Sequence, residues 1–82
     1  MVEVFKTNVL NKEEADFLVS LIHTLLPGSK SNFDLQDCDR ILRVFLPGEF
    51  IDTSFIIFLL ADYGYVAEIL SGNILLPKYA LR

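Results

Sequence analysis

The side chains with the clearest chemical potential lie in one acidic stretch. Asp37, Cys38 and Asp39 are consecutive, and Asp34 precedes them by three positions. Thiolates and carboxylates are metal ligands, and a thiolate is also a nucleophile. One thiol is too few for a closed zinc or copper site, and the stretch lacks the glycine and distal glutamate of a calcium loop. Two chains meeting across a dimer axis would supply two thiols, so a shared metal site is one hypothesis.

The simpler interpretation is an acidic turn that carries an inert or half-buried cysteine. Reactive thiols usually lie beside positive groups, and here the neighbours of Cys38 are acidic. The candidate metal ligands are therefore Cys38, Asp37 and Asp39, and the sequence predicts neither a bound metal nor a cofactor.

His23 is the only histidine. It lies about 11 residues into the helix expected over residues 12–26, roughly 16 Å from its first residue. Because that helix should begin at the end of the domain that carries Cys38, the two side chains are expected in opposite halves. A Cys–His catalytic pair is therefore not predicted, and no phosphate loop or other catalytic motif is recognisable. We expect a protein that is not an enzyme.

Hydrophobic spacing and turn residues define the elements that must position these side chains. Segments rich in β-branched and aromatic residues predict four strands, over 2–7, 32–36, 41–46 and 65–70. A first helix is predicted over 12–26 after an Asn11 N-cap, and a second to about residue 63 after Asp52 or Thr53. Glycine follows both helices, which favours their termination there.

This order of elements predicts an α+β fold, namely a ferredoxin-like βαββαβ sandwich with a four-stranded antiparallel sheet and two helices on one face. In that topology the loop 8–11, the turn 37–39 and the junction 64–65 meet at one end of the sheet. Residues 1–72 are expected to form the domain, and residues 73–82 to form a C-terminal tail or an edge segment.

Both helices carry more apolar residues than a single core-facing stripe needs. The stripe of the first helix is predicted as Ala15, Leu18, Ile22 and Leu25, and that of the second as Ile56, Ile57, Leu60 and Tyr63. The surplus residues are Phe17, Leu21, Phe55, Phe58 and Leu59.

Exposed apolar patches usually mark interfaces. The surplus residues therefore predict a surface for self-association or for a protein partner, unless the C-terminal segment covers them. A second, weaker patch is predicted on the open face of the sheet, from Phe5, Ile41 and Phe45.

Composition narrows the class of partner and the compartment. The chain has 82 residues, of which 52% are hydrophobic, and a net charge of −4. Nucleic acids and anionic membranes attract basic surfaces, so neither is an expected partner. The single cysteine, the absence of a signal-peptide pattern in MVEVFKTN and a longest apolar run of only seven residues predict a soluble, cytoplasmic protein.

The stretch from Ile41 to Ile69 contains a strand, a Pro-Gly turn, a capped helix and the segment DYGYVAEIL. It resembles the second half of a heavy-metal-associated (HMA) domain, a family that includes copper metallochaperones and the N-terminal modules of metal-transporting ATPases. The resemblance spans roughly residues 2–70 and implies a ferredoxin-like fold.

Members of that family bind a soft metal through a Met-x-Cys-x-x-Cys loop between the first strand and the first helix. The corresponding loop here, residues 6–12, reads KTNVLNK and contains no cysteine, histidine or methionine. Cu(I) prefers thiolate ligands. The resemblance therefore implies the fold without the metal chemistry, and no metal ligand is carried over.

The leading interpretation is a non-enzymatic protein-interaction module of HMA-like fold that binds another protein chain, expected to be a copy of itself. One alternative is a metal-binding or metal-trafficking protein that uses Cys38 and the neighbouring aspartates. Another is a small-molecule sensor domain, which rests on fold analogy alone.

Overall fold

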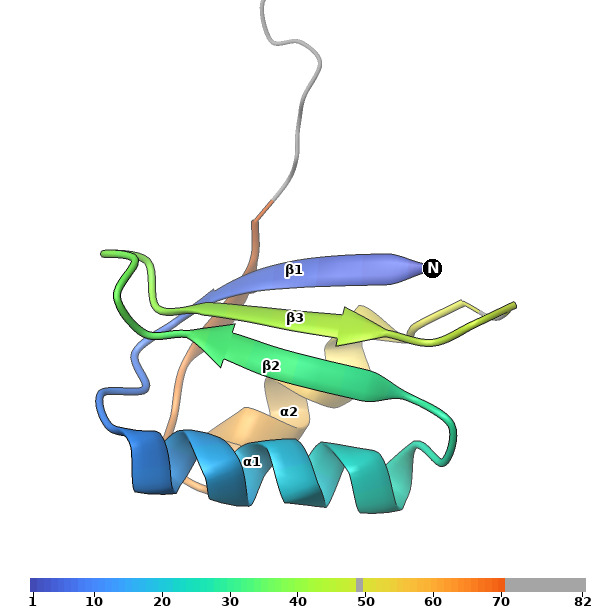
Figure 1. Cartoon of the computed structure of the whole chain (residues 1–82), viewed down its shortest axis with the longest axis horizontal. Coiled ribbons are helices and arrows are strands. Elements are labelled where there is room, and N and C mark those ends of the chain that lie inside the picture. Colours follow the sequence, from blue (N-terminus) through green and yellow to red (C-terminus); the bar gives the residue numbers. More distant parts are fainter. Residues whose placement is uncertain (49, 71–82) are drawn as a thin grey trace, which may run out of the picture.

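A computed structural model of the chain describes residues 1–48 and 50–70. Within them the predicted order of elements is confirmed (Figure 1). The elements are β1 (Val2–Thr7), α1 (Lys12–Leu25), β2 (Lys30–Asp34), β3 (Ile41–Phe45), α2 (Thr53–Asp62) and β4 (Ala67–Ile69). The tail or edge segment predicted for residues 73–82 lies outside the described residues.

The four strands form one sheet in the order β2-β3-β1-β4, and all neighbouring strands are antiparallel. Both helices lie on the same face of this sheet, and no described helix covers the other, open face (Figure 1). The architecture is therefore the α+β, ferredoxin-like arrangement that the element order predicts. It places β1 in the interior of the sheet and leaves β2 and β4 at the two edges.

The core lies between the sheet and the two helices. Its fully buried hydrophobic side chains are Phe5, Val9, Leu18, Ile22, Leu42, Val44, Ile56 and Leu60. The predicted stripes are confirmed at most positions, but Leu25 is 45% exposed and Tyr63 is 48% exposed. Leu25 is the last residue of α1 and Tyr63 follows the last residue of α2, so both lie at helix ends, past the buried turns.

Phe5 faces the helices, and its predicted place on the open face is wrong. Phe5 pairs with Leu42 across β1 and β3, and side chains opposite each other in a sheet share a face. Ile41 and Phe45 do lie on the open face, because they alternate with Leu42 and Val44 along β3. Ile41 is buried there, and Phe45 is 39% exposed.

Hydrogen bonds outside the sheet set the end of β2 and the start of β4, the two edge strands. β2 ends at Asp34 because its Oδ1 accepts the N–H groups of Gln36 and Asp37, at 3.2 and 3.3 Å, which turns the chain two residues earlier than predicted. β4 begins only at Ala67, because the Tyr65 N–H still donates to Leu60 O, at 2.9 Å.

Both helices begin at capping side chains. Asn11 Oδ1 accepts the N–H of Glu14 at 2.9 Å, and Asp52 Oδ1 accepts the N–H of Ser54 at 3.0 Å. Asp52, and not Thr53, is thus the N-cap of α2. Gly64 follows α2 with φ of +90°, a conformation that side chains with a Cβ rarely adopt. These local signals confirm the predicted starts and the predicted end of α2.

The different faces of Phe5 and Phe45 give a first prediction. Phe5→Ala should lower the free energy of unfolding by about 3–5 kcal/mol, because it empties a fully buried site. Phe45→Ala, in the neighbouring strand but on the open face, should cost less than half as much. Urea denaturation of both variants measures the difference. Equal losses would contradict the placement of Phe5 in the core.

Candidate functional site

Three segments that are distant in sequence meet at the end of the sheet where α1 begins, as predicted. The Thr7 N–H donates to Asp39 O at 3.0 Å, which ties β1 to the turn after β2. The Asn8 N–H donates to Val66 O at 3.3 Å, and the Val66 N–H donates back to Asn8 Oδ1 at 2.8 Å. These bonds join the loop before α1 to the segment after α2.

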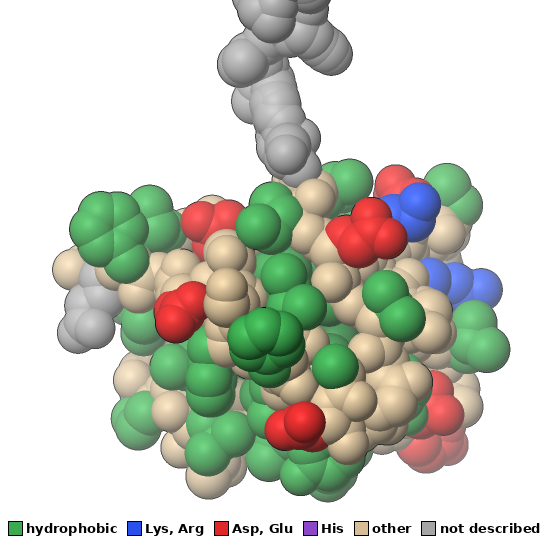
Figure 2. Space-filling view, turned by 180° about the vertical axis from the view of Figure 1, so that it is seen from behind, with side chains coloured by type: hydrophobic (Ala, Val, Ile, Leu, Met, Phe, Trp, Pro, Cys, Tyr) green, Lys and Arg blue, Asp and Glu red, His purple; other side chains and the backbone are tan. Residues whose placement is uncertain are grey.

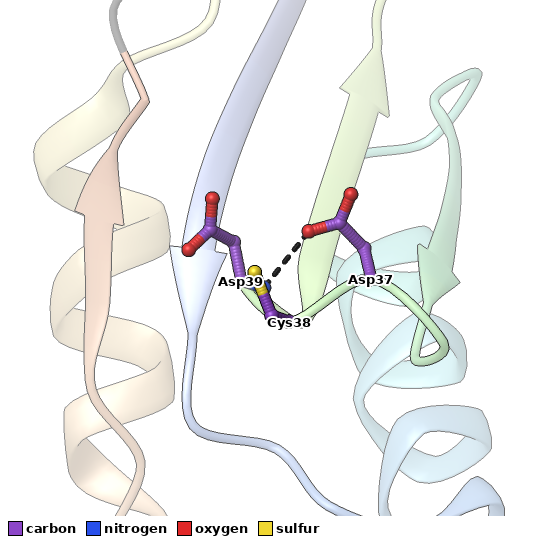
Figure 3. Close-up of side chains that lie close together, drawn as sticks. All are labelled: Asp37, Cys38 and Asp39. Atoms are coloured by element: carbon purple, nitrogen blue, oxygen red, sulfur yellow. Dashed lines mark hydrogen bonds between the residues drawn. The ribbon is translucent and has the colours of Figure 1, made fainter.

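The turn between β2 and β3 holds the predicted cluster of Asp37, Cys38 and Asp39 (Figure 3). One ligand atom from each lies within 4.8 Å of the others. Asp37 and Cys38 are exposed, and Asp39 is partly exposed.

Both carboxylates of this cluster already have partners. Asp37 Oδ1 accepts the Asp39 N–H at 2.8 Å, and Asp39 Oδ1 lies 3.8 Å from Lys6 Nζ. The short distances within the cluster therefore follow from the shape of the turn, in which Arg40 adopts a φ of +47°.

His23 does not join this cluster. It is exposed in the last turn of α1, while Cys38 lies at the end of the domain where α1 begins. His23 Nδ1 is 3.2 Å from the backbone oxygen of Ser29, in the connection to β2. The predicted separation of the histidine from the cysteine is confirmed.

Two groups near the start of α1 have shifted protonation equilibria. Partial burial raises the pKa of the Tyr65 phenol, and the negative charge of Glu14, which also accepts a hydrogen bond from it, raises that pKa further. The hydrogen bond and the charge of Asp16, one turn along the helix, raise the pKa of Lys12. Both shifts stabilise the form that is present at neutral pH, so neither indicates an acid or base poised for catalysis.

Three exposed aromatic side chains on the helix layer, two of which are in contact, are taken together as the second candidate site. Phe17 is 49% exposed and Phe58 is 68% exposed, as predicted. Phe17 makes an edge-to-face contact with Tyr63, with ring centroids 5.2 Å apart, and this contact joins α1 to the end of α2. Phe17, Phe58 and Tyr63 are called the aromatic face below. Figure 2, the view from behind, shows hydrophobic side chains reaching the surface of the molecule at several separate places.

The rest of the predicted surplus is less exposed than expected. Leu59 is only 8% exposed and belongs to the core, so its prediction as a surface residue is wrong. Leu21 and Phe55 are partly buried and pack against that core. The prediction of Tyr63 as a core residue is wrong, since its side chain is 48% exposed, and its position next to the helix-ending Gly64 is the sequence signal for a surface position.

No protein-family model matches this chain, and neither curated proteins nor solved structures show a match. Among residues 1–48 and 50–70, no helix has the length and apolar character required to cross a membrane. Function is therefore inferred from the geometry of the chain itself.

The metal hypothesis has a direct test at the turn between β2 and β3. We expect zinc to leave the thermal midpoint of the reduced protein nearly unchanged, because one thiol and two engaged carboxylates form a weak site. Cys38→Ser should then behave as the unsubstituted protein does in a thermal melt with and without zinc. A stoichiometric, Cys38-dependent stabilisation would instead establish a metal site.

Proposed function

We propose that this protein is a non-enzymatic interaction module whose aromatic face binds another protein chain, with a second copy of itself as the partner. The observation that carries the proposal is the exposure of Phe17, Phe58 and Tyr63 on the helix layer. Aromatic side chains are enriched at the centres of protein interfaces, where a few residues supply most of the binding energy.

The energetics favour the use of these residues for binding. Full burial of a Phe side chain is worth about 1.5–3 kcal/mol. Phe17 and Phe58 are carried by capped helices, and an aromatic ring has only two side-chain torsions to fix on binding. The loss of conformational entropy on association is therefore small compared with that of a flexible loop.

The loop before α1 also supports an interaction role over a metal role. In the resemblance to HMA domains, this loop corresponds to the one that holds the metal. Here Asn8 is hydrogen-bonded to the segment after α2, Val9 is fully buried and Leu10 is 66% exposed. The loop therefore contributes to packing and adds an exposed apolar side chain, without a soft-metal ligand.

Substitution of the aromatic face tests this proposal. Light scattering should show a mass above that of the monomer that rises with protein concentration. The double substitution Phe17→Ser/Phe58→Ser should weaken this association by about tenfold or more, because two apolar anchors are lost.

Phe50→Ser is the matched control, because Phe50 is 84% exposed but lies before α2, outside the aromatic face. It should leave the measured mass unchanged. An equal effect of both changes, or a wild-type chain that stays monomeric at all concentrations, would refute self-association through this face.

A further inference from the structure

The sheet has a free edge at β2. Strand β2 is five residues long and pairs only with β3, so its outer side has no partner strand among the described residues. The other edge strand, β4, is three residues long. An open edge strand presents unpaired backbone groups that can pair with a strand of another chain.

The pairing register identifies the backbone groups that β2 presents outward. Met1 and Leu46 exchange two hydrogen bonds, at 3.0 and 2.9 Å, which continues the ladder between β1 and β3. Because backbone direction alternates along a strand, Phe45 and Arg43 must direct their N–H and C=O groups toward β2. Their partners Lys30 and Asn32 bond inward to β3.

The same alternation directs the N–H and C=O groups of Ser31 and Phe33 away from the sheet. A groove runs along this side, between α1 and β2. It consists of two hollows, and Val19, Ser31 and Asn32 line both of them, so these residues lie where the two hollows meet. Within the described part of the chain, the buried Oγ atoms of Ser29 and Ser31 have no hydrogen-bond partner.

We propose that β2 pairs with β2 of a second copy, antiparallel and centred on Asn32, to make one continuous sheet across a symmetric dimer. In this register Ser31 lies opposite Phe33 of the second copy, so the outward N–H and C=O groups of both residues are satisfied in both chains. Lys30 lies opposite Asp34 of the second copy, and the symmetry repeats this ion pair.

The segment KSNFD is thus self-complementary in charge when read against its own reverse. Directly opposed side chains of opposite charge stabilise antiparallel pairs, whereas like charges destabilise them. This charge pattern favours a second copy over an unrelated peptide as the occupant of the edge. The middle of the groove then brings Val19 toward Val19 of the second copy.

This inference rests on the proposed self-association and adds a second contact, separate from the aromatic face. The two-fold axis is perpendicular to the sheet, so both helix layers lie on the same side of the joined sheet. Two aromatic faces are then presented in one direction. A second dimer, which presents two aromatic faces of its own, would be held more tightly by such a pair than by one copy, without any new contact.

The edge contact is tested in the Phe17→Ser/Phe58→Ser protein, in which the aromatic contact is removed. Light scattering of this protein should still show a dimer at high concentration. Adding Lys30→Glu places two acidic groups opposite each other, twice per dimer, and should weaken the dimer by about tenfold. Further addition of Asp34→Asn should restore much of the loss, because it removes the repulsion. Asn retains the Oδ1 that accepts the N–H groups of Gln36 and Asp37.

Lys6→Glu is the matched control for charge, because Lys6 lies on β1, in the interior of the sheet. It should not change the mass. Ser31→Pro removes one outward N–H per chain and should abolish the dimer, since proline is tolerated at a free edge but cannot donate there. Circular dichroism of each variant is the control that tests whether it remains folded.

Dimerisation that depends on Lys30 and Ser31, with Lys6→Glu unchanged, supports the edge pairing. If the wild-type chain associates but the Phe17→Ser/Phe58→Ser protein is monomeric, the edge pairing is wrong and the proposed function stands. A dimer of this protein that tolerates both Lys30→Glu and Ser31→Pro also overturns the edge pairing. A wild-type monomer at every concentration overturns both proposals.

Discussion

The burial of one face of a small sheet under two helices is the interaction on which the rest of the structure depends. Phe5, Leu42 and Val44 on the sheet are fully buried against residues of both helices. A domain of this size buries only about 60–65% of the surface that its unfolded chain exposes. With 52% hydrophobic residues, the chain has more apolar side chains than this single layer can cover. The surplus at Phe17 and Phe58 is a consequence of that limit.

Charged and polar side chains, and not apolar burial, characterise the other face of the sheet and its edge strand β2. The open face alternates charged and polar side chains with a few apolar ones, and the edge strand β2 begins with Lys30 and ends with Asp34. Charges at a strand edge normally oppose the pairing of strands from different molecules. When the two charges are opposite in sign and equally spaced from the centre of the strand, they instead favour antiparallel pairing with an identical strand, because each charge then lies opposite its counter-charge.

Features of the fold that depend on local signals were predictable from the sequence. Asn11 and Asp52 precede apolar helical segments, and Gly64 follows the second, so the helix ends needed no tertiary information. The face of Phe5 could not be obtained in this way. Val2 and Val4 alternate with it and are also apolar, and only the pairing with β3 decides which set faces the helices.

The candidate sites were predictable to a similar extent. Adjacency in the chain brings Asp37 and Asp39 together, but the partners that their carboxylates already bind are visible only in three dimensions. On α2, apolar residues occur on nearly every side of the helix, so hydrophobic periodicity does not indicate which side faces the core. The sequence pattern therefore predicts the wrong environment for Leu59 and Tyr63. It predicts the exposure of Phe17 correctly, because α1 has clear polar positions.

The interior position of β1 has a consequence for the order of folding. Its two neighbours are β3 and β4, so the first of the four described strands along the chain is completed by the last of them. The hydrogen bonds between Asn8 and Val66 close a loop of 58 residues. Contacts this distant in sequence slow folding, because chain entropy is lost before they form. During translation β1 emerges from the ribosome well before either of its sheet partners, and its apolar side chains have no native cover until those partners arrive.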